Sequence, residues 1–192
     1  MTRAPETDDP RPLTGEPMAI DLLNTRWVDA TGPRDLLAST TGLAVWLRGW
    51  AARFPAGDPP TADAETLDHL LRARDALAAL IDTPLSPAPG AIAELNAVLA
   101  RGRIRRNLTP GGPEDVIEVD SPSWLPAWAA AEDWLRLLAD RPERIRPCAG
   151  SECVLHFHDT SKNGTRRWCS MAGCGNRAKA RRHHARRRPE HD

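Results

Sequence analysis

The chain has 192 residues, of which 41% are hydrophobic, so it is long enough to bury a real core. No apolar run approaches the ~20 residues that a membrane-spanning helix needs, and residues 1–17 lack the apolar core of a signal peptide. We therefore expect a soluble, cytoplasmic protein with no membrane partner.

The formal net charge of zero hides an uneven distribution. Lys and Arg number 13 against 21 Asp and Glu before Arg141, and 13 against 5 from Arg141 onward. An acidic body joined to a basic end indicates that only the end meets a polyanion. We predict a body at residues 18–141, a basic unit at 142–188 and a short tail at 189–192.

The N-terminal segment, residues 1–17, is rich in proline and charge and is predicted to be a flexible tail. The apolar run at 19–27 fits either a strand or a helical turn. Apolar residues then recur at helical spacing over residues 43–50, with Thr40 or Thr41 as the cap.

A second helix is predicted from Thr61, as N-cap, to about Asp82, and a third over residues 92–102. Two β-prone runs, 104–108 and 116–119, flank a Pro- and Gly-rich segment and predict a hairpin with a longer loop. A fourth helix follows, with Ser123 as its cap. The body is therefore predicted to be mostly helical, with a small β-hairpin or sheet.

The chain has seven tryptophans. Large rings on helix faces dominate burial, so we expect most of them in the core; a ligand pocket lined by some of them is the alternative. The four on the apolar faces of the predicted helices are Trp46, Trp50, Trp124 and Trp128.

Four cysteines, Cys148, Cys153, Cys169 and Cys174, follow the pattern C-x4-C-x15-C-x4-C. In a reducing compartment, two close pairs joined by a hairpin-length insert favour metal ligands over two disulfides. Four soft thiolates suit one structural zinc ion with a closed tetrahedral shell.

The insert between the cysteine pairs is predicted to form a hairpin, with strands at 154–158 and 165–168 and a turn at 162–164. Ser170 would cap a helix that carries Cys174 in its first turns. A knuckle with the first cysteine pair, then a hairpin, then a helix with a ligand: this order predicts a treble-clef-like finger. The whole chain is predicted to have an α+β fold. Because the unit is small, we expect its folding to depend on the metal.

Four histidines near the cysteines are rival ligands. Four thiolates already complete a tetrahedral shell, so we expect no histidine in it. The four are His156, His158, His183 and His184.

Residues 146–187 resemble the CGNR zinc finger, above all at 157–161 and 167–179. The run that names the family is Cys174 to Arg177 here. Segments 19–25, 43–50 and 92–100 resemble the ABATE domain that commonly precedes this finger. The resemblance implies a family of stress-induced bacterial transcription regulators, in which the finger binds DNA and the N-terminal domain senses a signal.

Ten Lys and Arg and no acid lie between Lys162 and Arg188, a density that favours salt-dependent binding to phosphates. Arg177, Arg181 and His184 share one helix face at i, i+4 and i+7, and arginine can bind guanine bidentately. The predicted DNA contacts are Lys162, Arg166, Arg167, Asn176, Arg177, Lys179, Arg181, Arg182, His184 and Arg186.

We therefore expect a zinc-dependent, DNA-binding transcription regulator whose N-terminal domain senses a small molecule or a partner. Specific recognition by one small finger needs a second module or a homodimer. The alternative is an adaptor whose finger binds RNA or a protein, or else a basic helix that binds polyanions without specificity. An enzyme is not expected, because Asp21, Asn24 and His69 are isolated polar residues that fit capping or surface roles.

Overall fold

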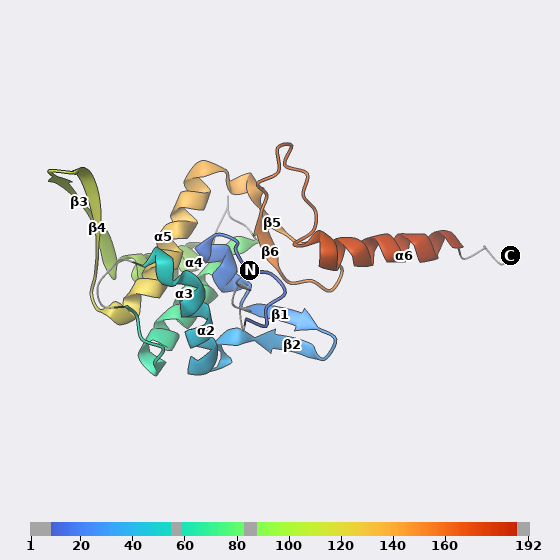
Figure 1. The fold of residues 1–192 in the computed structure, drawn as a ribbon, viewed down its shortest axis with the longest axis horizontal. Helices are drawn as coiled ribbons and strands as arrows, with labels where there is room; N and C mark the ends of the chain where they lie inside the picture. The colour runs from blue at the N-terminus through green and yellow to red at the C-terminus, as the bar shows by residue number, and fades with distance from the viewer. Residues whose placement is uncertain (1–8, 55–58, 83–87, 188–192) are drawn as a thin grey trace, which may run out of the picture.

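The computed structural model describes residues 9–54, 59–82 and 88–187. It has the predicted α+β fold: a helical body, and a finger that ends in a helix standing away from it (Figure 1). Among the described residues, no helix has the length and apolar character needed to cross a bilayer. The helices are α1 (Met18–Leu23), α2 (Thr40–Trp50), α3 (Ala64–Ile81), α4 (Pro89–Leu99), α5 (Leu125–Asp140) and α6 (Asn176–Arg187).

The strands form three separate antiparallel pairs. The first and second pairs belong to the body, whereas the third opens the finger. They are β1 (Arg26–Asp29) with β2 (Gly32–Asp35), β3 (Gly102–Thr109) with β4 (Gly112–Val119), and β5 (Ile145–Pro147) with β6 (His156–His158).

The core is built around the short helix α1, so the run at 19–27 is a helical turn followed by a strand. α1 packs on α3 and α5, and Ile20 and Leu22 are completely buried. Pro17 has no side chain that can cap α1; instead, the Asp133 carboxylate on α5 accepts a hydrogen bond from the Ala19 N–H at 3.0 Å. The start of α1 is therefore fixed by tertiary packing rather than by its own sequence.

The next two helices begin at caps that differ by one or two residues from the prediction. Ser39 caps α2 by accepting from the Gly42 N–H at 3.3 Å, and Asp63 caps α3 by accepting from the Thr66 N–H at 2.8 Å. Both cap residues have extended backbones, from which a short polar side chain reaches the first turn. Thr40 and Thr61 therefore do not cap these helices.

α4 and α5 also start at positions that differ from the prediction. Pro89 occupies the first turn of α4, where its missing N–H costs nothing. α5 follows a single 3-10 turn at Pro122–Trp124, and Ser123, the expected cap, bonds the Ser121 hydroxyl instead. The helices themselves lie where the apolar periodicity placed them.

The β3–β4 hairpin confirms the predicted pair of strands, but its loop is shorter. Thr109 pairs with Gly112, so only Pro110 and Gly111 join the strands. Gly112 has φ +112°, a conformation that glycine adopts without strain and that permits this tight connection. The hairpin stands out from the body at the end opposite α6 (Figure 1).

The flexible tail predicted for residues 1–17 is wrong for residues 9–17, and residues 1–8 lie outside the described residues. Arg11 and Glu16 are each only 8% exposed. Arg11 joins Asp9 at 2.7 Å and the buried Asp21 at 2.8 Å. Paired charges replace the apolar contacts that this segment lacks, a device that composition does not reveal.

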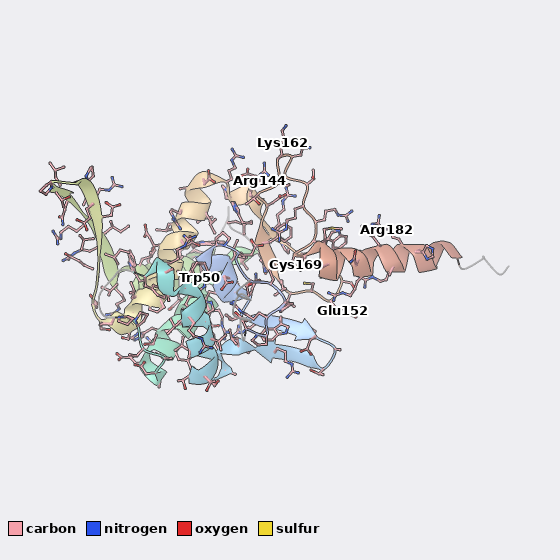
Figure 2. All side chains as sticks on the ribbon, in the orientation of Figure 1. Trp50, Arg144, Glu152, Lys162, Cys169 and Arg182 are labelled. Atoms are coloured by element: carbon pink, nitrogen blue, oxygen red, sulfur yellow. The ribbon has the colours of Figure 1, made fainter. Side chains whose placement is uncertain are left out.

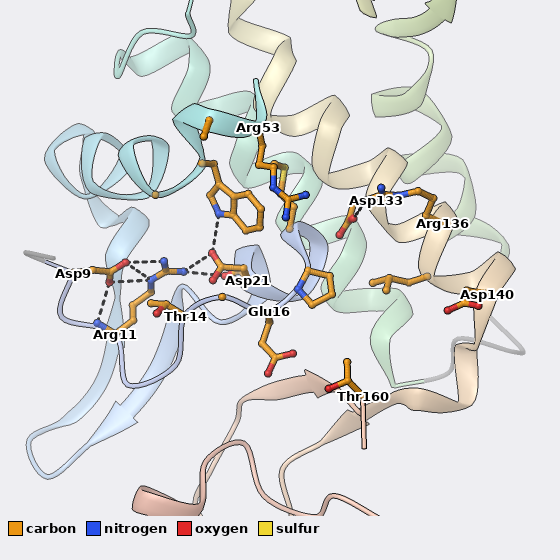
Figure 3. Close-up of a pocket in the computed structure, with 17 residues that line it drawn as sticks. Asp9, Arg11, Thr14, Glu16, Asp21, Arg53, Asp133, Arg136, Asp140 and Thr160 are labelled. Carbon is orange, nitrogen blue, oxygen red and sulfur yellow. Dashed lines mark hydrogen bonds and ion pairs between the residues drawn. The ribbon is translucent and has the colours of Figure 1, made fainter. Parts of the chain in front are cut away.

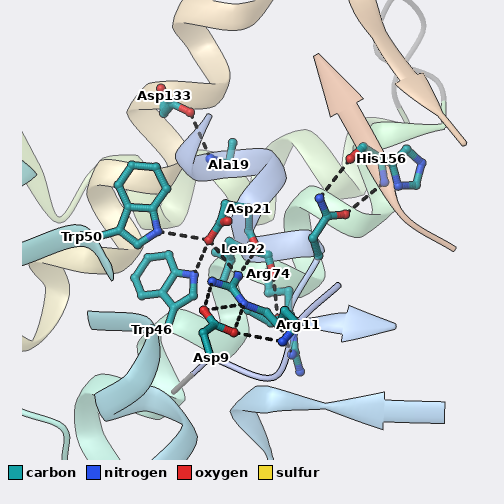
Figure 4. A network of polar contacts seen from close by, with 12 residues as sticks. Asp9, Arg11, Ala19, Asp21, Leu22, Trp46, Trp50, Arg74, Asp133 and His156 are labelled. Carbon is teal, nitrogen blue, oxygen red and sulfur yellow. Dashed lines mark hydrogen bonds and ion pairs between the residues drawn. The ribbon is translucent and has the colours of Figure 1, made fainter. Parts of the chain in front are cut away.

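The tryptophans confirm the core prediction for the most part. Trp27, Trp46, Trp128 and Trp134 are buried, and the other three are partly buried. Trp46 and Trp50 also donate their indole N–H groups to the Asp21 carboxylate, at 3.0 and 3.1 Å (Figure 4). Asp21 therefore ties α1, α2 and the N-terminal segment together.

Candidate metal centre and nucleic-acid interface

The first cysteine pair lies on a tight knuckle that follows β5. The Cys148 N–H donates to the Leu155 carbonyl at 2.9 Å, and the Cys153 N–H donates to the Gly150 carbonyl at 3.0 Å. A Cβ added at Gly150 would lie 3.0 Å from the Cys153 Cβ and 3.2 Å from the Cys174 Sγ. Only glycine leaves enough room for the backbone to pass this close to the sulfurs.

The second pair is positioned by the start of a helix. Cys169 precedes Ser170, whose hydroxyl accepts from the Gly173 N–H at 3.2 Å and so confirms the predicted cap. The turn at Met171–Gly175 is wider than an α-helix and carries Cys174 inward, after which α6 continues. Local capping thus brings the second pair of sulfurs to the knuckle.

The four sulfurs converge on one point: all lie within 4.8 Å of one another. The Cys153–Cys169 and Cys169–Cys174 Sγ distances are 3.8 and 3.6 Å. A tetrahedron with Zn–S bonds of ~2.3 Å has S···S edges of about 3.8 Å, so the site has the size that zinc requires. Within the described residues, this is the one group of potential ligands that could hold a metal.

The sulfurs lie close enough to shift one another's pKa values. A hydrogen bond from the Cys169 thiol lowers the pKa of Cys153 to about 5. The same contact raises the pKa of Cys169, and burial raises that of Cys174. Cys153 is therefore the thiol that ionises most readily, and a bound dication stabilises the thiolate form of a ligand.

Two N–H groups donate hydrogen bonds to the sulfurs and stabilise their negative charge. The Cys169 N–H donates to the Cys148 Sγ at 3.3 Å, and the Arg177 guanidinium donates to the Cys174 Sγ at 2.9 Å. Arg177 was predicted to read bases, but one of its nitrogens serves the metal centre. Donors of this kind tune and orient metal ligands.

Among the described side chains, no histidine lies in the sulfur cluster. The pKa of His156 is lowered by burial, although Asp82, 3.7 Å from its Nε2, works against this. His158 Nε2 is buried without a hydrogen-bond partner. Of the other two, His183 is not part of the sulfur cluster, and the side chain of His184 lies outside the described residues.

The hairpin predicted within the insert is wrong. β6 pairs with β5, upstream of the first cysteine, and residues 165–168 form no strand. The reason is Arg166, whose guanidinium donates to the carbonyls of Trp168 at 3.1 Å and Cys169 at 2.6 Å. Its own N–H donates to the buried Asp159 carboxylate at 3.0 Å, so side chains take the places of ladder bonds.

Arg166 also joins the finger to the body. Its guanidinium pairs with Glu16 at 2.9 Å and lies 4.2 Å from the centre of the Phe157 ring. Glu16 in turn accepts from the His158 N–H at 2.9 Å. Arg166 was predicted to contact DNA; in the structure its partners join the finger to the body.

Asn24, expected to be an isolated polar residue, makes the second link across this junction. It is 1% exposed, and its amide both donates to the His156 carbonyl at 2.9 Å and accepts from the His156 N–H at 3.0 Å. The two bonds reproduce the pairing of a neighbouring strand at the open edge of β6. Sequence reasoning missed the contact because 132 residues separate the partners.

The remaining basic residues fall into two groups. Figure 2 shows Lys162 on a loop and Arg182 on α6, well apart. Arg167, 5.3 Å from the Trp168 ring centre, is exposed, and Arg181 donates to the Ser151 hydroxyl of the knuckle at 2.7 Å. Asn176, Lys179 and Arg182 are exposed on α6, and the Arg186 side chain lies outside the described residues.

Two protein-family models match the chain. The model of the CGNR zinc finger matches residues 144–187. The ABATE model, whose description is "Putative stress-induced transcription regulator", matches residues 16–141. A search of curated proteins finds no match.

The fold and the sulfur site define a zinc-finger protein with a helical N-terminal domain, and its cofactor is a structural zinc ion held by the four cysteines. The chain belongs to the ABATE family and carries a C-terminal CGNR zinc finger.

Proposed function

We propose that the chain regulates transcription by binding duplex DNA through its zinc finger, with the exposed cations of α6 on the phosphates. One observation carries this proposal: α6 stands clear of the body (Figure 2), and its Lys179 and Arg182 side chains are exposed. Within the described chain neither side chain pairs with an acid. Membership of a family described as transcription regulators supports the same function.

The metal centre orients this helix. Cys174 lies in the turn that leads into α6, and Ala178, one turn later, is buried against the finger. Arg177 and Arg181 are exposed too, but they donate to the Cys174 Sγ and the Ser151 hydroxyl. Lys179 and Arg182 make no such bond within the described residues. We therefore propose that Lys179 and Arg182 bind phosphates, while the remaining donors of Arg181 are the nearest candidates for base edges.

A binding selection on random duplex DNA with zinc-loaded protein tests the proposal. Enrichment of a motif at physiological salt is expected. Lys179→Ala and Arg182→Ala should each weaken binding and lower the slope of log affinity against log salt by about 1. Arg72→Ala removes an exposed cation from α3 and should change neither quantity.

The adaptor function makes a different prediction. If the finger binds RNA or a protein, the selection enriches no duplex DNA motif. RNA then competes with DNA for α6 at equal salt. Unchanged DNA affinity in Lys179→Ala and Arg182→Ala would contradict the assignment of α6 as the DNA surface.

A groove of about 600 Å³ between body and finger favours a sensing function for the N-terminal domain. Trp27 and Ile81 from the body and Val154 from the finger give it apolar walls. Arg74 at its side is 2% exposed, and its Nε has no hydrogen-bond partner. We propose that an apolar, aromatic-sized effector binds here, where it touches both parts of the chain.

A larger cavity of about 860 Å³ is less suited to an apolar ligand (Figure 3). Arg11, Asp9 and Asp21 in its wall are paired with one another, and Asp133 is paired with Arg136. Its buried charges are therefore already satisfied within the protein.

Thermal unfolding with indole and benzoate as probes tests the groove. Both probes should raise the melting temperature of the wild type but not of Ala78→Trp, which fills the groove. Ala79→Trp adds the same ring on the exposed side of α3 and should keep the response. An equal response in the two variants would place the probes elsewhere.

A further inference from the structure

The β3–β4 hairpin forms an arm that stands away from the helical body (Figure 1). Its base is held where Gly102 lies against Trp128, so closely that an added Cβ would come within 2.7 Å of the indole. Beyond the base, most of its residues are exposed. An isolated two-stranded ribbon is only marginally stable, so the outer part of the arm calls for a surface that covers it.

The two faces of the arm differ sharply. Because side chains alternate along a strand, the register places one apolar set on a single face. On that face Leu108 is 85% exposed and Ile104 is 43% exposed. A cluster of exposed apolar side chains on a protruding element is typical of an interaction surface. The apolar set is Ile104 and Leu108 from β3, with Pro113, Ile117 and Val119 from β4.

The charges of the arm argue against a nucleic acid as the partner. β3 carries three arginines and β4 three acids, so the arm is neutral. The arginines are paired with the acids: Arg103 and Arg105 with Glu118, at 2.6 and 2.7 Å, and Arg106 with Asp115 at 3.3 Å. The arm therefore offers no excess positive charge to phosphates.

The same charges fit a second copy of the arm. On the apolar face, the one charged pair is Arg106 with Asp115. Two such faces can meet about a two-fold axis that runs along the arms. In that arrangement β3 of one copy lies over β4 of the other. Arg106 of each copy then approaches the position of Asp115 in the other copy. Side-by-side pairing of two β3 strands would instead set arginine against arginine.

We propose that this protein dimerises through the arm, apolar face against apolar face. Strands of 8 residues at ~3.4 Å each make the arm about 27 Å long, which gives an interface at the small end of specific contacts. The dimer is therefore weak and forms as the protein concentration rises. The proposal is independent of what the finger binds.

Sedimentation of the zinc-loaded full chain over a range of concentrations tests the proposal. The wild type should show a monomer–dimer equilibrium, and Leu108→Asp should raise its dissociation constant by roughly 100-fold, because a charge replaces a buried apolar group in both copies. Leu135→Asp alters an apolar side chain of α5 that is 41% exposed, and should leave the equilibrium unchanged. A monomeric wild type, or a dimer insensitive to Leu108→Asp, would overturn the proposal.

A charge exchange tests whether arm meets arm. Arg106→Asp and Asp115→Arg should each be monomeric, because the two faces then carry like charges. An equimolar mixture should recover a heterodimer, since one arm is now negative and the other positive. If circular dichroism shows both variants folded and the mixture still fails to associate, contact between the arms is excluded. If Leu135→Asp loses the dimer, the arm packs on α5 of the partner instead.

Discussion

Replacing Asn24 by Ala should loosen the finger from the body. The substitution removes a fully buried amide and leaves both the N–H and the carbonyl of His156 without their partners. Each bond contributes about 1 kcal/mol net, and a buried group left unpaired costs ~1–3 kcal/mol. We therefore expect a loss of about 2–4 kcal/mol in the free energy of unfolding, a large share of typical domain stability.

Equilibrium denaturation in urea measures this loss, and hydrogen exchange at the His156 amide locates it. Asn24→Asp should also destabilise the junction, because a carboxylate can accept from the His156 N–H but cannot donate to its carbonyl. Asn163→Ala changes an exposed loop amide and should stay within ~0.5 kcal/mol. A loss below about 1 kcal/mol in Asn24→Ala, with unchanged exchange at His156, would refute the role assigned to this amide.

Three further outcomes follow from the metal centre and the body. Chelation, or Cys169→Ser, should unfold the finger as seen by circular dichroism, whereas stoichiometric zinc retained in that variant would contradict the four-thiolate site. Gly150→Ala should weaken zinc binding in a chelator competition, because its Cβ meets the knuckle; Gly49→Ala, which has open space on α2, should instead raise stability by ~0.5–1 kcal/mol. The pKa of Asp35 is lowered: burial works to raise it, but hydrogen bonds and charge from Arg74 outweigh that effect. The Asp35 carboxylate therefore contributes its full stabilisation above the ordinary Asp pKa and loses it as pH falls through the lower pKa of the folded state. In urea titrations from pH 5 to pH 3, the difference in unfolding free energy between wild type and Asp35→Asn should shrink.

The sequence predicts those parts of the molecule that depend on local spacing. The cysteine pattern gives the metal centre, because two pairs with short internal gaps can each supply one side of a tetrahedron. Apolar periodicity likewise gives α2 and α3, and the Ser170 cap gives the start of the helical segment that carries Cys174.

The missed features all depend on partners far apart in the chain. Residues 154–158 and 165–168 look equally strand-like, but Arg166 and Asp159 satisfy the backbone of the second segment, so it needs no ladder. Burial of Arg11 and Glu16 requires Asp21 and Arg166, which periodicity does not connect to them. A proline-rich charged segment therefore looks like a tail until its partners are known.

The positions of the arm and α6 constrain how a dimer would meet DNA. They lie at opposite ends of the molecule (Figure 1), so a dimer joined through its arms about the two-fold axis proposed above carries its two fingers at its outer ends. Two such fingers cannot occupy neighbouring major grooves on straight DNA. We therefore expect selected sites to be single half-sites or widely spaced pairs, with Leu108→Asp abolishing any preference for pairs. Enrichment of palindromes with half-sites about 10 bp apart would contradict arm-mediated pairing on DNA.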